Sequence, residues 1–176
     1  MFEKFGEFDS AQELNRAAAA QLAEGDTGAV LALAEENGID PEDAQDYIDG
    51  AAAELATPLM AALGKLAAEK RELEISGILG DWTEYIEEAC AGDPAMAAAV
   101  RRKGKSLQKA MGELIRFAFE HKVRVSDKIV SITKVTQNGR QEAMRGPLYL
   151  GMPDRAQTKR LLRAYYLGEG GQNDRL

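Results

Sequence analysis

Cysteine and histidine are almost absent from this chain. Its 176 residues hold one cysteine, Cys90, and one histidine, His121. A single cysteine cannot form an internal disulfide or supply a cysteine-based zinc site, and a single histidine excludes a site built on paired histidines. We expect Cys90 to be a small buried residue on a helix, and we expect neither a metal nor another cofactor.

Aromatic residues and long apolar runs are also scarce. Aromatic side chains make up 6% of the chain, and alanine supplies much of its 45% hydrophobic content. No apolar run approaches the roughly 20 residues that span a bilayer, and no charged-then-apolar leader opens the chain. These features predict a cytoplasmic protein without a membrane partner, folded as one domain or as two small ones packed together.

Familiar catalytic motifs are missing too. Neither G-x-S-x-G nor H-E-x-x-H occurs, and His121 stands at a predicted helix end, where a cation offsets the carbonyl dipoles. The stretch AVRRKGKS, residues 99–106, comes close to the nucleotide-binding loop G-x-x-x-x-G-K-S/T, but Ala99 replaces the first glycine. We therefore predict a helix, a break at Gly104 and a second helix capped by Ser106, and we do not expect an enzyme.

Charge is divided sharply along the chain. Residues 1–98 hold 22 acidic and 5 basic residues, a net charge of −17, whereas residues 99–176 hold 7 acidic and 17 basic residues, a net charge of +10. We therefore distinguish an acidic helical half at 1–98, a basic helical half at 99–167 and a disordered tail at 168–176. Such asymmetry favours charged partners, although the halves could also neutralise each other within the fold or in a homo-oligomer.

Helix signals dominate the sequence. The fold class they predict is mainly α: a compact domain of about seven to nine helices with at most a small β-hairpin in the C-terminal half. Residues 123–150 are rich in β-branched side chains and read as either sheet or loop, with a turn at Asn138-Gly139. Expected helix starts are Ser10 with Glu13, Asp40 with Pro41, Asp81, Asp93 with Pro94, Ser106, and Pro153 for the last helix.

An acidic stretch, DPEDAQDYIDG, covers residues 40–50. It does not match a calcium-binding loop, because glycine is absent from the sixth position and a helix start intervenes. One interpretation is a solvated helix face. The other is a row of carboxylates that imitates nucleic-acid phosphates toward a basic protein partner. The candidate partner-binding residues are Glu42, Asp43, Asp46 and Asp49.

Two groups of cations are candidates for nucleic-acid binding. Clustered lysines and arginines can neutralise phosphates and release counterions. The nearby Tyr165 and Tyr166 could stack on bases, but their helical spacing is more typical of a core. No pattern of base readout is legible, so sequence-specific recognition is not expected. The candidate nucleic-acid-binding residues are Arg101, Arg102, Lys103, Lys105 and Lys109, followed by Arg155, Lys159, Arg160 and Arg163.

Two stretches resemble proteins of mobile elements. The opening MFEKFGEFDSAQELNRAAAAQLAEGD with ALAEENGIDPEDAQDYIDG looks like small proteins of conjugative elements and prophages in gut Firmicutes. The later RRKGKSLQKAMGELIRFA followed by GMPDRAQTKRLLRAYYL is similar to a K-S-L…Y-Y pattern in related mobile-element proteins. Some of these proteins are anti-CRISPR proteins that inhibit the type II RNA-guided nuclease. The resemblance implies a non-enzymatic inhibitor whose partner is the type II CRISPR effector nuclease with its guide RNA, and DNA is a further expected contact. The alternative is a nucleic-acid-binding accessory protein of a mobile element.

Overall fold

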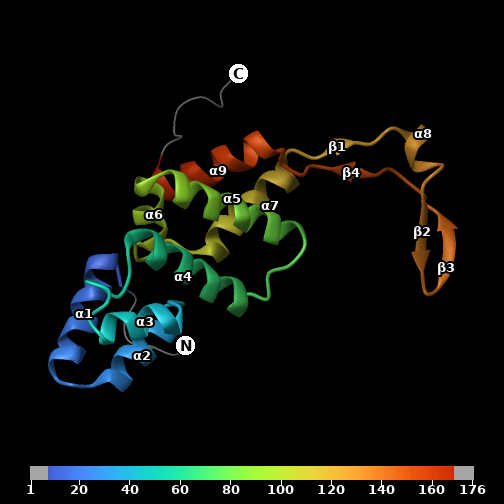
Figure 1. The fold of residues 1–176 in the computed structure, drawn as a ribbon. Helices are drawn as coiled ribbons and strands as arrows, with labels where there is room; N and C mark the ends of the chain where they lie inside the picture. Colours follow the sequence, from blue (N-terminus) through green and yellow to red (C-terminus); the bar gives the residue numbers. More distant parts are fainter. Residues whose placement is uncertain (1–7, 169–176) are drawn as a thin grey trace.

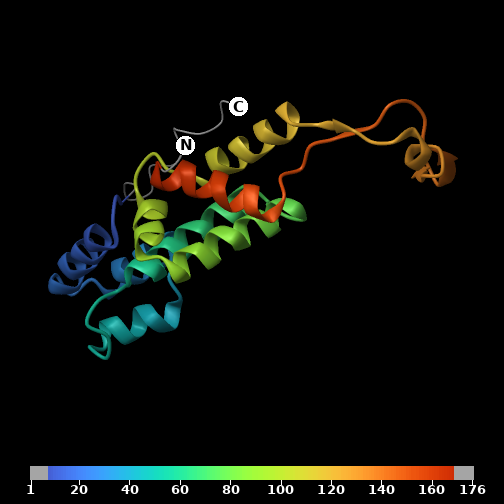
Figure 2. The same ribbon diagram turned by 90° about the horizontal axis from the view of Figure 1, so that it is seen from above.

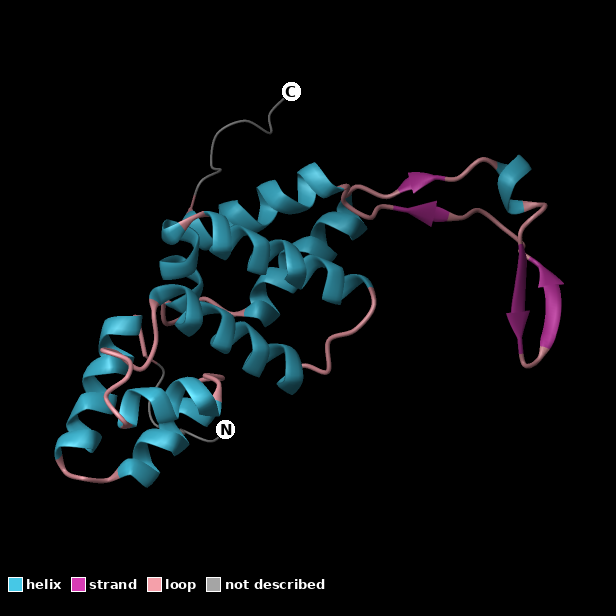
Figure 3. Ribbon diagram, in the orientation of Figure 1, coloured by secondary structure: helices cyan, strands magenta, loops and turns pink. Residues whose placement is uncertain are grey.

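Helices make up most of the computed structural model, which describes residues 8–168 (Figures 1 and 3). The mainly α fold class is confirmed, and none of the described helices is long and apolar enough to cross a membrane. The helices are α1 (Ala11–Ala23), α2 (Thr27–Glu36), α3 (Pro41–Ile48), α4 (Pro58–Glu72), α5 (Ile78–Gly92), α6 (Pro94–Arg101), α7 (Leu107–Glu120), α8 (Asp127–Val130) and α9 (Arg155–Leu167). The strands are β1 (Val123–Arg124), β2 (Lys134–Gln137), β3 (Arg140–Ala143) and β4 (Tyr149–Leu150).

Local capping explains where most helices begin. Side-chain oxygens accept hydrogen bonds from the first free backbone N–H groups of each helix. The expected caps that the structure confirms are Ser10, Asp40, Asp93 and Ser106, each bonded two or three residues ahead. Two expectations were wrong. Helix α5 begins before Asp81, with Gly77 at its N-cap, and α9 begins after Pro153, with Asp154 forming a capping box with Gln157.

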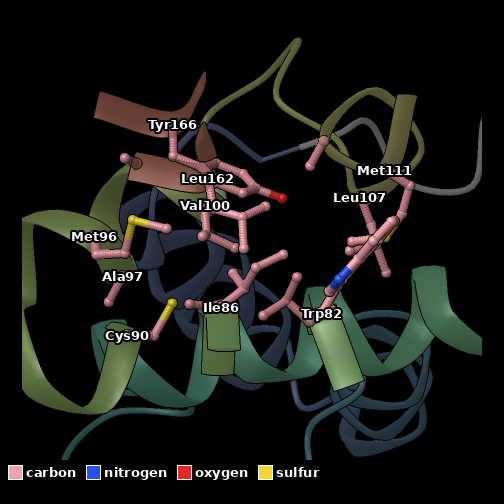
Figure 4. Packing of buried hydrophobic residues seen from close by; sticks show 14 of the residues in the cluster. Trp82, Ile86, Cys90, Met96, Ala97, Val100, Leu107, Met111, Leu162 and Tyr166 are labelled. Carbon is pink, nitrogen blue, oxygen red and sulfur yellow. The ribbon is translucent and has the colours of Figure 1, made fainter. Parts of the chain in front are cut away.

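Two hydrophobic cores meet along α4. The first is formed by α1, α2, α3 and the start of α4, up to Ala61. The second begins at Ala62 and joins α4, α5, α6, α7 and α9 around residues such as Trp82 and Ile86, as Figure 4 shows. Burial of these apolar side chains supplies the main favourable free energy of folding. We call residues 8–57 the N-terminal lobe, and residues 58–122 with 151–168 the C-terminal lobe.

The two lobes touch through a close backbone contact as well as through side chains. Gly38, at the end of α2, and Gly64, on α4, approach so closely that a Cβ on Gly64 would lie 2.2 Å from the carbonyl oxygen of Asn37. Beside this contact, the buried Arg101 donates from Nη2 to Oδ1 of Asn37 at 2.7 Å, and its guanidinium lies 5.9 Å from the ring centre of Phe8. Through Arg101, the last residue of α6, the C-terminal lobe therefore also contacts Asn37 and Phe8 of the N-terminal lobe.

The turn between α6 and α7 is stabilised by hydrogen bonds from a buried lysine. Lys65 is 7% exposed, and its ammonium donates to three backbone carbonyls of this turn. The acceptors are Val100 at 3.1 Å, Arg102 at 3.2 Å and Lys105 at 2.6 Å. Carbonyls at the end of a helix have no partner within the helix, so a cation placed there stabilises them.

Residues 123–150 leave the helical body as an arm (Figures 1 and 2). In its stem β1 pairs antiparallel with β4, and at its far end β2 and β3 form a hairpin turned by Asn138-Gly139, both with positive φ. The arm therefore contains two small antiparallel strand pairs, and the sequence predicted at most one small hairpin. Gly151 fixes the return to the body, because a Cβ there would lie 2.0 Å from the carbonyl oxygen of Ala118 on α7. Except for Gly168, which ends α9 in a left-handed conformation, the tail expected at 168–176 lies outside the described residues.

Replacing Gly64 by alanine should loosen the junction between the lobes. The added methyl group overlaps backbone atoms of Asn37 and Gly38, which cannot rotate away, so we expect the free energy of unfolding to fall by about 1–3 kcal/mol in spite of alanine's better helix propensity. Chemical denaturation measures it. Gly112→Ala on α7 is the matched control: its Cβ would meet no atom, so it should be neutral or stabilising. Equal effects at both positions would contradict the close contact.

Replacing Lys65 by methionine should weaken the turn between α6 and α7. The change keeps an unbranched side chain, one heavy atom shorter, but removes the donor to three buried or part-buried carbonyls, so we expect a loss of about 2–3 kcal/mol. Hydrogen exchange of the amides at 102–106 should also accelerate. Lys70→Met, on the same helix but partly exposed, should change stability by less than about 0.5 kcal/mol. A turn that exchanges at its original rate in the Lys65 variant would argue against this role.

Candidate protein and nucleic-acid interfaces

The carboxylates expected on the acidic stretch share one solvent-facing side of α3. Helix α3 begins after Asp40, and it buries Ala44 and Tyr47 against the N-terminal core. Helical spacing then turns the other positions outward. All four candidates are exposed: Glu42, Asp43, Asp46 and Asp49. Among the described residues none of them is paired with a lysine or arginine, and the side-chain amide of Gln45 donates to Asp49 at 3.0 Å.

These four residues belong to a larger acidic surface. The N-terminal lobe holds 12 acidic residues and one basic residue, Arg16, a net charge of −11. Ten of the 12 carboxylates are exposed, so the lobe presents a negative electrostatic potential to solvent. A hollow between α3 and the start of α4 is lined by Asp43, Asp46 and Glu54 and by the apolar Met60. Together these groups suit the charged tip and aliphatic stem of a basic side chain.

Two cations of the first basic group, Arg101 and Lys105, make contacts within the protein. Arg101 is buried and bonded to Asn37, so it is not offered to solvent. Lys105 donates its ammonium to the carbonyl of Tyr165 and lies 4.7 Å from that ring's centre. The ammonium of Lys109 donates to the carbonyl of Gly104 at 3.1 Å but remains exposed. The exposed members of this group are Arg102, Lys103 and Lys109.

The second basic group lies on α9 and largely faces acidic residues of the same lobe. Lys159 and Arg155 lie 3.2 and 3.6 Å from the carboxylate of Glu88 on α5. Arg163 pairs with Asp93 at 3.0 Å, and this hydrogen bond, with one from the Ala95 N–H, holds the pKa of Asp93 below its ordinary value. Such partly exposed pairs are screened by solvent and contribute little to stability. Arg160 is the exposed member of the group with no such pair among the described residues.

The residues that resemble a nucleotide-binding loop are used to join two helices. Gly104 takes a positive φ of 76° in the turn, and the Ser106 hydroxyl caps α7 by accepting from the N–H of Lys109 at 3.2 Å. The backbone N–H of Ser106 donates to the hydroxyl of Tyr165 at 2.9 Å. Tyr166 is 1% exposed, and burial raises its pKa. The tyrosines therefore pack at the junction of α7 and α9, as their spacing predicted.

Cys90 and His121, the two residues most often associated with catalysis, both have places in the packing of the helices. Burial raises the pKa of the Cys90 thiol to about 12, which keeps it protonated at neutral pH. His121 is the C-cap of α7, its ring stacks on Phe117 at 4.0 Å, and its Nδ1 lies 3.0 Å from the Phe117 carbonyl oxygen. Within residues 8–168 no group of three or more histidine, cysteine or carboxylate side chains is placed to hold a metal ion.

Sequence reasoning missed two features of these surfaces. One is Lys65, whose position among the apolar residues Ala61, Ala62 and Leu66 on one face of α4 was the available signal of its burial. The other is the exposed arm at 123–150, where the β-branched residues suggested strands but not that the strands would leave the helical body. Its cations were not among the candidates.

Comparison with known proteins adds no further constraint. No protein-family model, curated protein or solved structure that was compared matches this chain.

Proposed function

We propose that this chain is a non-enzymatic inhibitor that binds the type II CRISPR effector nuclease and blocks DNA engagement or cleavage, with the N-terminal lobe as its docking surface. The observation that carries the proposal is the gathering of ten exposed carboxylates and one cation on that lobe. The partner is proposed from the resemblance of the two stretches to small mobile-element proteins, some of which are anti-CRISPR proteins. The partner class and the surface therefore rest on separate grounds.

Electrostatics supplies a mechanism for such an inhibitor. RNA-guided nucleases hold the guide–target duplex in a positively charged channel and read a short DNA motif through arginines. Exposed carboxylates on α3 and its C-cap, at positions 43, 46 and 49, present fixed negative charge at helical spacing, as a phosphate backbone would. Complementary charge steers association and raises its rate at low salt. An occupied channel then excludes the DNA.

A second candidate function is a nucleic-acid-binding accessory protein of a conjugative element or prophage. Exposed cations of the C-terminal lobe favour it: Arg102, Lys103, Lys109 and Arg160 remain open to solvent after the ion pairs of α9 are formed. The lobe as a whole is close to balanced, with 14 basic and 11 acidic residues. This weak excess makes the acidic lobe the stronger docking surface.

Neutralising the acidic face of α3 should weaken inhibition without unfolding the protein. The variant Glu42→Gln, Asp43→Asn, Asp46→Asn, Asp49→Asn removes four exposed charges that make no ion pair within the described chain. We expect the association rate with guide-loaded nuclease to fall at least about tenfold, since steering contributes factors of roughly 10 to 1,000. Surface plasmon resonance at two salt concentrations and a DNA cleavage assay measure the loss.

The matched control removes four charges from the other lobe. Glu72→Gln, Glu74→Gln, Glu84→Gln and Glu87→Gln change net charge equally, so inhibition should persist. Adding the protein before or after DNA separates the blocked steps, because an inhibitor of DNA engagement has no effect on nuclease already loaded with DNA. The proposal fails if the unmodified chain neither binds the nuclease nor reduces cleavage, and the docking surface is misplaced if both quadruple variants behave alike.

A further inference from the structure

The arm at 123–150 is not stabilised by a core of its own. Within these 28 positions, all of them described, Val130 is the one buried residue. The β2–β3 hairpin is open to solvent on nearly all of both faces, with only Val135 partly covered. An isolated two-stranded hairpin is marginally stable in water. A surface of this kind gains stability when a partner covers it.

Charge indicates which partner fits. The arm carries five cations and two carboxylates, a net charge of +3. Arg124 holds one of the carboxylates, Asp127, through contacts at 3.0 and 2.8 Å. The other four cations are exposed and make no ion pair within the described residues: Lys128, Lys134, Arg140 and Arg145. The arm therefore presents four exposed cations beside one further carboxylate, Glu142.

The hairpin register separates the side chains into two faces. Thr136 lies opposite Gln141, and Lys134 lies opposite Ala143, so these four residues share a face that has no carboxylate. Its polar members are hydrogen-bond donors suited to phosphates and base edges. A protein partner that added to this ribbon would be favoured by large apolar residues here, and the face offers only the methyl groups of Ala143 and Thr136.

We propose that the arm binds duplex DNA, with the β2–β3 ribbon in the major groove and the four unpaired cations on the flanking phosphates. The B-form major groove is about 12 Å wide and admits a two-stranded ribbon. The major groove of an RNA duplex is deep and narrow and does not admit one. This site goes beyond the proposed function, since it lies on the opposite side of the charge division from the acidic lobe and needs no nuclease.

The test measures binding of the full-length protein alone to a fluorescent DNA duplex across a salt series. Four phosphate contacts predict a slope of about −3.6 in log affinity against log salt, or roughly a hundredfold weakening between about 50 and 200 mM salt. The arm variant Lys128→Gln, Lys134→Gln, Arg140→Gln, Arg145→Gln should lose at least about tenfold in affinity at the low-salt end and most of the slope. Circular dichroism should show an unchanged fold, because all four side chains are exposed.

A charge-matched variant of the helical body is the control. Arg16→Gln, Lys70→Gln, Arg71→Gln and Lys122→Gln also remove four exposed or partly exposed cations, and this variant should bind DNA as the unmodified protein does. Equal losses in both variants, or a loss in the body variant alone, would overturn the proposal. So would tighter binding to an RNA duplex or single strand. Light scattering that shows the arm cations holding two copies together would also overturn it. This assay does not measure nuclease inhibition. A negative result would therefore contradict DNA binding by the arm but not the proposed docking surface on α3.

Discussion

The rest of the structure depends on the backbone contact at Gly64. Because α4 carries no side chain there, the turn at Asn37 and Gly38 comes close enough for the two cores to share one helix. The next residue, Lys65, binds the carbonyls of the turn between α6 and α7. One short stretch of α4 therefore sets both the junction of the lobes and the path of the basic turn.

Folding redistributes the charge that the sequence divides. Acidic residues of α5 and its C-terminal cap, Glu88 and Asp93, pair with cations of α9, so much of the basic half is neutralised within the C-terminal lobe. The N-terminal lobe has one cation to offset its 12 carboxylates, and the arm has four cations without acidic partners among the described residues. Exposed charge without an opposite partner in the described chain is accordingly found on the acidic lobe, at the turn between α6 and α7, and on the arm. Charge divides near residue 98, whereas the cores divide near residue 61.

An acidic surface and a basic surface on one protein suit the proposed role of binding other macromolecules. A row of carboxylates needs no chemistry to exclude nucleic acid from a positive channel, and cations on an exposed ribbon need none to hold a phosphate backbone. The buried thiol of Cys90 and the capping role of His121 account for two residues that could otherwise suggest chemistry. Both proposals therefore rest on binding geometry and on charge.

Much of the fold could be predicted from the sequence because its signals are local. Helix starts at Ser10, Asp40 and Ser106 and the turn at Asn138-Gly139 each depend on hydrogen bonds or dihedral preferences within a few residues. So does the outward face of α3. Contacts 35 to 64 residues apart in sequence decided the rest: the burial of Lys65, and the bond that withdraws Arg101 from solvent. Only the tertiary structure could say which cations remain available, since a charge is exposed or paired according to what folds against it.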